Sequence, residues 1–204
     1  MDFQLEQWIN HGAGLHRLVD AVMVALAQWS EPFFIALVLG WLVMALARGM
    51  GAERERAVAA LVASGLALLV NQLISQVWFR PRPFAAHPGA VRVLLTHLAD
   101  ASFPSDHVAA AVAISVVLWS AHRRLGLIAL VLSVAIGYAR VFVGDHYPGD
   151  VAGGAIVGAG AGLFMVSPWV RRLVSRADGA LARRLGAGPT GPRGEQRPLT
   201  GPER

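Results

Sequence analysis

The amino-acid sequence predicts an all-α fold, a polytopic membrane bundle of about six transmembrane helices with an outward-facing active site. Apolar residues form 55% of the 204-residue chain, more than a water-soluble core of this length would bury. Long apolar runs recur between breaks rich in arginine, proline and glycine, and about 20 residues cross a hydrocarbon layer of ~30 Å. Polar residues suited to catalysis gather in breaks that alternating helices would bring to one side.

The chain is expected to begin with an interfacial segment over residues 1–17. Phe3 and Trp8 provide an apolar face beside Asp2 and Glu6, a pattern typical of a helix that lies in the membrane surface. A cleaved secretory signal needs a basic start, and these acidic residues argue against one. We therefore expect the first apolar segment to be retained.

The transmembrane domain is expected over residues 18–175, and its first two segments are predicted to meet at a proline. The first runs from about residue 18 to Trp29 and ends at Glu31-Pro32, since proline disfavours helical geometry in the residue before it. The second runs from Phe33 to Ala47. The first of these segments is short for a full crossing.

Four further segments follow, each bounded by charged or proline-rich breaks. They span Ala57 to Phe79, Val108 to Ala121, Leu125 to Val143, and Pro148 to about Val170. Glycines alternate with alanines along the last segment, which favours close helix contact. Residues 176–204 are rich in Gly, Pro and Arg, and we expect a largely disordered cytoplasmic tail because few apolar residues are available to form a core.

Arginines at alternate breaks orient the predicted bundle. If successive segments alternate in direction, one side of the membrane receives Arg48, Arg54, Arg56, Arg123, Arg124, Arg171, Arg172 and Arg176. The positive-inside rule makes that side cytoplasmic. The loop over residues 80–105 and the turn over residues 144–149 then lie together on the outer side.

Charge and composition exclude several classes of function. The net charge is +5, but every basic residue is an arginine. These arginines gather near segment ends rather than in a stripe interleaved with aromatic residues, so no nucleic-acid binding is expected. The chain has no cysteine, which excludes disulfides and thiolate metal sites. We expect catalysis without a cofactor.

Arginines near the outer membrane surface are the first candidate site residues. Arg82 and Arg140 are the leading candidates for phosphate ligands, with Arg80 as a further one. A guanidinium presents a planar set of donors to phosphate oxygens and stays protonated. Structural alternatives exist for two of them. Arg80 also suits an interfacial anchor, and Arg140 also suits an ion pair with Asp145 or Asp150.

A second candidate block is Pro104-Ser105-Asp106-His107, immediately before an apolar helix. Ser105 suits the N-cap position, and the exposed N–H groups at a helix start attract an anion. His107 is placed to protonate a leaving oxygen, since histidine titrates near neutral pH. Capping alone would explain Ser105, and an isolated histidine is usually structural.

The third candidate block contains His146 and Asp150, four residues apart. This spacing brings the two side chains together if the turn is helical. Asp150 would then orient the imidazole, and His146 would attack phosphorus as a nucleophile.

A metal site is the competing interpretation, and the histidines available to it are His87, His97, His107 and His146. Their spacing matches no zinc motif, so no metal is expected.

Together, the three blocks resemble the type 2 phosphatidic acid phosphatase superfamily, and within it the bacterial undecaprenyl diphosphate phosphatases. The residues that carry the resemblance are Phe79-Arg80-Pro81-Arg82-Pro83-Phe84, Ser102-Phe103-Pro104-Ser105-Asp106-His107 and Gly144-Asp145-His146-Tyr147-Pro148-Gly149-Asp150. The resemblance extends over about Ala57 to Val170. This chain departs from the family pattern at three positions, where Ser75 replaces a lysine, Asp106 a glycine and Ala139 a serine.

The resemblance implies a reaction and a role for each site residue. His146 would form a phosphohistidine with support from Asp150, and His107 would protonate the departing lipid phosphate. The phosphoryl oxygens would be held by Arg82, Ser105 and Arg140. The implied reaction converts undecaprenyl diphosphate to undecaprenyl phosphate without a metal. It would take place at the outer face of the bacterial inner (plasma) membrane, where it recycles the lipid carrier of peptidoglycan biosynthesis.

Other functions are compatible with the same residues. The alternatives are a phosphatase for phosphatidic acid, phosphatidylglycerol phosphate or a lipid-linked sugar phosphate, a lipid phosphotransferase, and a non-catalytic membrane protein that binds anions. In each case the expected partners are a lipid phosphate and the surrounding membrane lipids. Asp106 is expected near the phosphate, where it would pair with an arginine or repel a highly charged substrate. Two outcomes are compatible with the cation missing at Ser75: Arg80 substitutes for it from a different direction, or the enzyme binds its phosphate less tightly.

Overall fold

The computed structural model describes residues 1–95, 98–170 and 172–173. The elements of the compact unit Met1–Ser167 are, in chain order, α1 (Asp2–Asn10), α2 (Arg17–Ala47), α3 (Gly51–Val77), α4 (Pro83–Ala86), α5 (Asp106–Ala121), α6 (Arg123–Phe142) and α7 (Pro148–Val166). The described part contains no strand beyond an isolated bridge between Pro81 and Ala101, so the predicted all-α fold is confirmed. The predicted tail over residues 176–204 lies outside the described residues.

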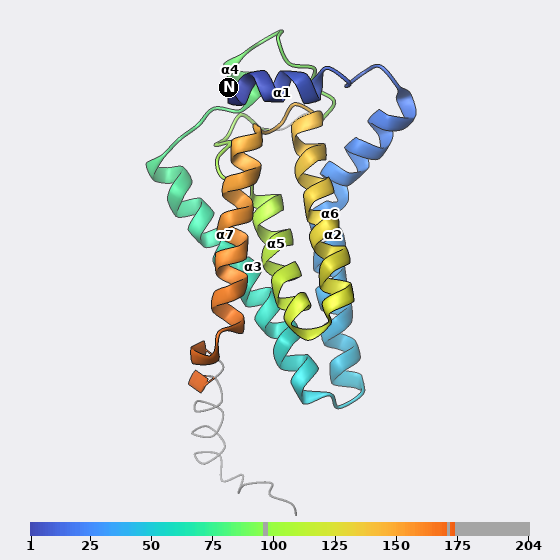
Figure 1. Cartoon of the computed structure of the whole chain (residues 1–204), viewed down its shortest axis with the longest axis vertical. Coiled ribbons are helices and arrows are strands. Elements are labelled where there is room, and N and C mark those ends of the chain that lie inside the picture. The colour runs from blue at the N-terminus through green and yellow to red at the C-terminus, as the bar shows by residue number, and fades with distance from the viewer. Residues whose placement is uncertain (96–97, 171, 174–204) are drawn as a thin grey trace, which may run out of the picture. The chain divides into compact units, whose positions relative to one another are not determined.

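Five helices of this unit form a membrane bundle. Helices α2, α3, α6 and α7 are long and apolar enough to cross a membrane, and α5 is a shorter apolar helix packed among them. The chain runs down α2, up α3, down α5, up α6 and down α7 in Figure 1. This order places α1, the loop over residues 80–105 and the α6–α7 turn at one end of the bundle, which we call the α1 end. The α2–α3 and α5–α6 turns lie at the opposite end.

The predicted break at Glu31-Pro32 is wrong, because α2 is one helix of 31 residues with Pro32 in its interior. A proline removes one backbone donor and crowds the preceding turn, but membrane helices tolerate this where neighbouring groups bind the freed carbonyls. Pro32 cannot donate to the carbonyl of Gln28, four residues before it. The adjacent Ala27 carbonyl accepts hydrogen bonds from Ser30 Oγ at 3.4 Å and Arg140 Nη1 at 3.3 Å, which stabilise this turn of α2. The two segments expected before residue 48 are therefore one, and the described bundle has five helices rather than six.

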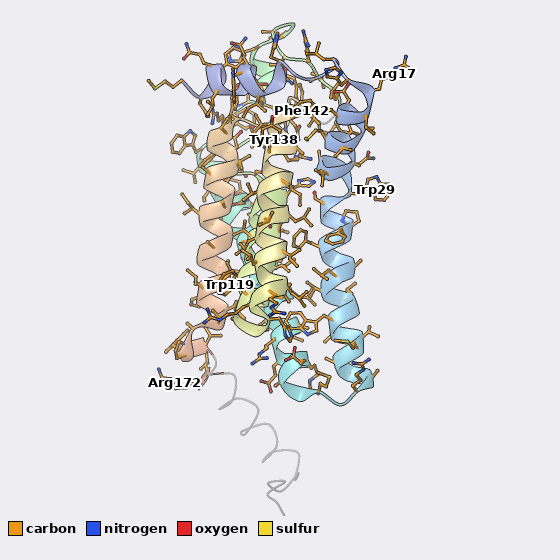
Figure 2. The ribbon with its side chains drawn as sticks, turned by 45° about the vertical axis from the view of Figure 1, so that its right-hand side comes forward. Arg17, Trp29, Trp119, Tyr138, Phe142 and Arg172 are labelled. Atoms are coloured by element: carbon orange, nitrogen blue, oxygen red, sulfur yellow. The ribbon has the colours of Figure 1, made fainter. Side chains whose placement is uncertain are left out.

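The outward surface of the bundle is apolar, as a lipid environment requires. Large apolar side chains are exposed on the spanning helices, among them Leu39, Leu69, Val134 and Ile156. Trp29 points away from the bundle in Figure 2 and is 63% exposed. Patches of this extent are unusual on a water-soluble monomer. The protein is therefore a multi-pass membrane protein.

Helix α1 crosses the α1 end of the bundle with its polar side turned inward. Asn10 Nδ2 donates to the carbonyls of Arg92 and Phe142, both at 2.8 Å, and Glu6 is fully buried. Burial raises the pKa of Glu6 to about 7. Trp8, by contrast, is 77% exposed. The N-terminal segment thus joins the loop over residues 80–105 to the end of α6.

Close packing of α7 on α5 brings the second and third sequence blocks together. A Cβ atom at Gly154 would lie 2.4 Å from the Ser105 carbonyl oxygen, and one at Gly158 would lie 2.3 Å from that of Ala109. Only glycine allows this separation, in agreement with the packing expected from the small residues of the last segment. The Ser105 N–H consequently reaches the Asp150 carbonyl at 3.0 Å.

Replacement of Gly158 by alanine should destabilise the protein by about 1–3 kcal/mol, because the new methyl group would force α5 and α7 apart. Gly160→Ala is the matched control, since nothing lies within 4 Å of a Cβ atom there and alanine favours a helix over glycine by about 1 kcal/mol. Thermal unfolding in detergent measures both variants. Equal melting temperatures for the two would contradict the proposed contact.

Candidate active site

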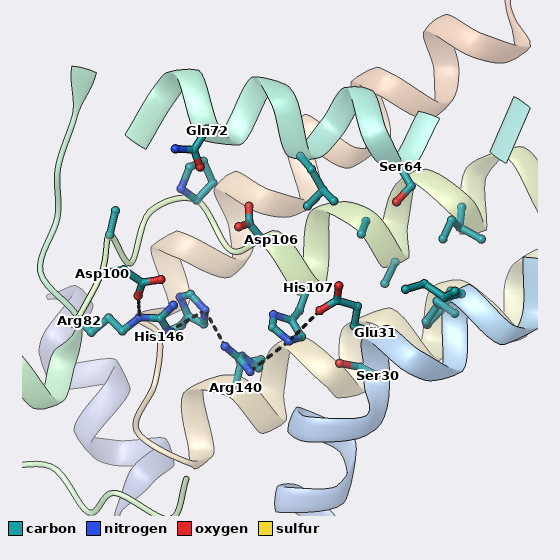
Figure 3. A pocket seen from close by; sticks show the side chains of 18 residues that line it. Ser30, Glu31, Ser64, Gln72, Arg82, Asp100, Asp106, His107, Arg140 and His146 are labelled. Atoms are coloured by element: carbon teal, nitrogen blue, oxygen red, sulfur yellow. Dashed lines mark hydrogen bonds and ion pairs between the residues drawn. The ribbon is translucent and has the colours of Figure 1, made fainter. Parts of the chain in front are cut away.

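A cavity of about 510 Å³ lies between α2, α3 and α5 near the α1 end. Its polar part is formed by Glu31, Gln72, Arg82, Asp100, Asp106, His107, Arg140 and His146. Its apolar part is formed mainly by Phe34, Ile35, Leu68, Ala110, Ala111 and Ile114. Figure 3 shows a row of interactions from Asp100 through Arg82, His146, Arg140 and His107 to Glu31, with Gln72 and Asp106 to one side of it. The cavity therefore has a charged end beside an apolar region.

His146 presents one ring nitrogen to the cavity and is held by the other. Nδ1 lies 2.9 Å from the Ser102 carbonyl oxygen, which only accepts hydrogen bonds, so Nδ1 carries the proton and Nε2 keeps its lone pair. Burial lowers the pKa of this imidazole below 6.5, and the guanidinium groups of Arg140 and Arg82 act in the same direction. The neutral ring with a free Nε2 is the form that acts as a nucleophile.

Asp150 supports His146 through a network rather than through a direct hydrogen bond. Its Oδ2 lies 3.6 Å from His146 Nδ1, beyond hydrogen-bond range. That oxygen accepts instead from Ser102 Oγ at 2.5 Å and from the Tyr147 N–H at 2.9 Å. Ser102 thus binds the histidine through its carbonyl and the aspartate through its hydroxyl. Sequence reasoning placed Ser102 in the second block but assigned it no role.

Arg82 and Arg140, the two arginines predicted to bind phosphate and called the clamp arginines below, both contact the same nitrogen of His146. Arg82 Nη1 lies 3.4 Å and Arg140 Nη2 lies 3.3 Å from Nε2. Arg82 is 6% exposed and Arg140 is 1% exposed, so their guanidinium groups carry little hydration of their own. Asp100 accepts from Arg82 Nε at 2.6 Å, and Asp145 forms ion pairs with both arginines. Arg140 therefore makes the predicted ion pair and also lines the cavity.

His107 faces the opposite side of the Arg140 guanidinium. Its Nε2 lies 3.5 Å from Arg140 Nη1 and 3.9 Å from Glu31 Oε2, as Figure 3 shows. Both histidines of the predicted mechanism therefore flank one arginine inside one cavity. Sequence reasoning treated Glu31 only as a helix end. The signal for its position was a carboxylate inside an apolar segment, which usually faces a polar interior.

Arg80 lies outside the cavity lining, unlike Arg82. Its Nη1 binds Asp150 Oδ1 at 2.8 Å and its Nη2 binds Asp2 Oδ2 at 2.6 Å. The guanidinium group of Arg80 also stacks on the Tyr147 ring, with its Cζ atom 3.8 Å from the ring centre. The structure therefore places Arg80 behind Asp150, where it connects α1 to the start of α7.

The remaining predicted residues lie at the start of α5. Ser105 occupies the N-cap position, but its fully buried hydroxyl makes no cap hydrogen bond, so the expected capping is wrong. Asp106 lines the cavity and accepts from Asn71 Nδ2 at 2.8 Å rather than from a clamp arginine. Ser75 donates to the Gln72 carbonyl at 3.0 Å and does not line the cavity.

The competing metal interpretation finds no assembled site in the part of the chain that the structure describes. No group of three or more potential ligand side chains there is placed to hold an ion. His87 stacks on Phe3 with ring centres 3.6 Å apart, away from the residues that line the cavity. His97 lies outside the described residues. His107 and His146 each face Arg140, whose positive charge disfavours a cation between them.

Comparison with known proteins gives a consistent family signal. The model of the PAP2 superfamily matches residues 56–173. Undecaprenyl-diphosphatase BcrC of Bacillus subtilis (strain 168) is 34% identical over 188 residues, which cover 88% of this chain and 93% of that protein. Putative undecaprenyl-diphosphatase YbjG of Escherichia coli (strain K12) is 32% identical over 158 residues, covering 73% and 78%. Aquifex aeolicus LpxE superposes with a TM-score of 0.68 at 25% identity, covering 81% and 94%.

At neutral pH, His146 should be uncharged with its proton on Nδ1, because burial opposes the charged ring and the Ser102 carbonyl binds the Nδ1 proton. Nitrogen-15 NMR of histidine-labelled protein in detergent distinguishes the two tautomers and the charged ring, and a His146→Gln variant assigns the signal. A charged ring at neutral pH, or a proton on Nε2, would contradict this geometry.

Proposed function

This chain belongs to the PAP2 superfamily and is a membrane lipid phosphatase, and we propose that it hydrolyses undecaprenyl diphosphate to undecaprenyl phosphate through a phosphohistidine intermediate. The observation that carries the proposal is the unprotonated Nε2 of His146, a residue of the cavity lining, which lies between two buried guanidinium groups. A nucleophile with donors on both sides matches what phosphoryl transfer requires, namely positioning and charge stabilisation.

In the first step, the Nε2 lone pair of His146 attacks the terminal phosphorus. The bond from phosphorus to the bridging oxygen breaks, and its electron pair leaves with the lipid phosphate. Arg82 and Arg140 bind the equatorial oxygens of the transferred group, while His107 gives its proton to the bridging oxygen. The Ser105 hydroxyl is buried without a hydrogen-bond partner among the described residues, which supports a role in donating to the phosphoryl group.

In the second step, the roles of the flanking groups reverse. Neutral His107 accepts a proton from water, and the resulting oxygen attacks the phosphorus of the phosphohistidine. The bond between phosphorus and Nε2 breaks, which restores the lone pair of His146 and releases orthophosphate. The network of Ser102 and Asp150 keeps the proton on Nδ1 throughout. Positive charge comes from the arginines and the start of α5, so we propose that the reaction needs no metal.

The proposed substrate is supported by the shape of the cavity and by the relatives. An apolar region formed by α2, α3 and α5 adjoins the charged end, and it suits the first isoprene units of a polyprenyl chain. The same surface would also accept acyl chains. Phosphatidic acid, phosphatidylglycerol phosphate and lipid-linked sugar phosphates are therefore tested alongside, and added alcohol acceptors test for phosphoryl transfer.

We further propose that the site faces outward from the bacterial inner membrane, with the C-terminus cytoplasmic. Five arginines lie at or beside the α2–α3 and α5–α6 turns, at the bundle end opposite the site. Arg48 follows α2, Arg54 and Arg56 lie near the start of α3, and Arg123 and Arg124 begin α6. The positive-inside rule supports a cytoplasmic location for these turns. An outward site suits recycling of the carrier lipid of peptidoglycan biosynthesis.

Replacement of His146 by alanine should abolish phosphate release, and His107→Ala should lower kcat about 10²- to 10⁴-fold, the usual contribution of a general acid. His87→Ala is the matched control because His87 stacks on Phe3 outside the cavity lining, and it should keep most of the activity. Purified protein is assayed on the lipid panel with a chelator present. Full activity of either His146→Ala or His107→Ala would refute the mechanism.

Single cysteines at Ala90 and Arg124 should be labelled from opposite sides of the membrane. Both positions are exposed, and they lie at the two ends of the bundle. The chain has no native cysteine, so a membrane-impermeant maleimide reports each site alone in intact cells. We expect Ala90→Cys to react in intact cells and Arg124→Cys to react only after lysis. The reverse pattern would place the site in the cytoplasm.

A further inference from the structure

Asp145 is a buried carboxylate that contacts both clamp arginines. Its side chain is fully buried, its Oδ1 lies 2.6 Å from Arg82 Nη1, and its Oδ2 forms an ion pair with Arg140 Nη2. The Asp145 N–H also donates to the Arg140 carbonyl at 3.1 Å. Asp145 precedes the nucleophile in the chain, and its Oδ2 lies 3.7 Å from His146 Nε2. One carboxylate therefore contacts all three groups that would surround a phosphoryl group.

The cavity shows from which side Asp145 acts. Arg82, Arg140 and His146 all line the cavity, but Asp145 does not. The carboxylate therefore meets the guanidinium groups from the protein side, and a phosphoryl group would approach them from the cavity side. A guanidinium has five N–H donors, so each arginine can bind Asp145 and still direct other donors toward phosphate.

We propose that Asp145 is a positioning residue of this phosphatase, which joins the two clamp arginines from behind and limits how tightly they hold phosphate. The proposal rests on the phosphatase function put forward above. Asp145 has no role in the mechanism described there, and it touches neither substrate nor leaving group.

Charge repulsion explains why such a residue is needed. Two guanidinium groups within 3.4 Å of the same nitrogen repel each other, and the low exposure of both side chains weakens the screening by water. A carboxylate between them offsets this repulsion and fixes their relative placement. Without it, the site would carry one more positive charge, and orthophosphate, the last product to leave, would be held more tightly.

Asp100 provides a natural comparison within the same site. It also binds Arg82, through Nε at 2.6 Å, but its side chain is 63% exposed and contacts only one of the two clamps. Water screens an exposed ion pair. Asp100→Asn and Asp145→Asn therefore remove the same charge from the same arginine, and only the second removes the bridge to Arg140.

The experiment compares these two asparagine variants with wild-type protein, purified as full chains in detergent and assayed on a polyprenyl diphosphate. For Asp145→Asn we expect kcat to fall about 10- to 100-fold, as expected when catalytic groups lose their alignment. The inhibition constant for orthophosphate should fall about 3- to 10-fold, because one negative charge beside the anion is removed. Asp100→Asn removes one exposed partner of Arg82, so it should change both quantities less than Asp145→Asn does.

The pH dependence of kcat/KM supplies a measurement that a purely structural role would not change. A carboxylate 3.7 Å from His146 Nε2 favours the protonated ring, so its removal favours the neutral nucleophile. Asp145→Asn should therefore move the acid limb of the profile to lower pH, and by more than Asp100→Asn does, because Asp100 contacts Arg82 and is exposed. Both the limb and the inhibition constant are independent of the fraction of protein that is active.

The possible outcomes separate the two proposals. Wild-type protein inactive on every lipid phosphate would refute the proposed function. Thermal stabilisation by orthophosphate would then still test Asp145, since Asp145→Asn should respond at lower phosphate concentrations. An active wild type with Asp145→Asn indistinguishable from Asp100→Asn would refute the inference alone. If Asp145→Asn does not fold, Asp145→Glu is measured instead. Its longer side chain keeps the charge but displaces the carboxylate from the two arginines, so kcat should fall. An unchanged kcat of Asp145→Glu would overturn the proposal.

Discussion

The structure at the α1 end of the bundle depends on how two buried arginines, Arg82 and Arg140, are accommodated beside the neutral His146. A charged side chain costs about 2.5–3.5 kcal/mol at the centre of a membrane helix on insertion scales and less toward its ends, and Arg82 and Arg140 are both buried. Each is balanced by a carboxylate. Asp145 serves both arginines, and Asp100 adds a partner for Arg82. The pairing allows concentrated positive charge to remain inside a folded membrane protein.

A second charge network holds the nucleophile from the other side. The Asp150 carboxylate accepts hydrogen bonds from Arg80, from the Ser102 hydroxyl and from the Tyr147 N–H. The Ser102 carbonyl in turn accepts the Nδ1 proton of His146. Arg80 continues the chain of contacts to α1 through Asp2. The residues that orient His146 thus lie away from the cavity, whereas Arg82, Arg140 and His107 line it. This separation leaves Nε2 accessible while the rest of the ring is restrained.

Helix packing makes these contacts possible. Glycines of α7 rest on the backbone of α5, so the start of α5 meets the start of α7. That contact places His107, at the first turn of α5, in the same cavity as His146, which lies just before α7. The uninterrupted α2 adds Glu31 and an apolar wall to the cavity. The charged end and the apolar region of the cavity suit a lipid phosphate, whose head and tail differ in the same way.

The sequence by itself determined the all-α membrane fold, the three blocks and their common end of the bundle. These features depend on apolar run length, alternation of helix direction and the close spacing of His146 and Asp150, all of which are local. The continuity of α2 through Pro32 was not predicted, because this turn is stabilised by a tertiary contact, the hydrogen bond from Arg140 to the Ala27 carbonyl, and the local preference of proline does not decide it. Only the tertiary structure decided that Ser102 binds His146, that Arg80 lies behind Asp150 and that Asp145 joins the clamps. Ser102 and Arg80 meet their partners across 44 and 70 residues, and Asp145 meets Arg82 from another segment. Such contacts arise from the packing of helices against one another, which no spacing within one segment encodes.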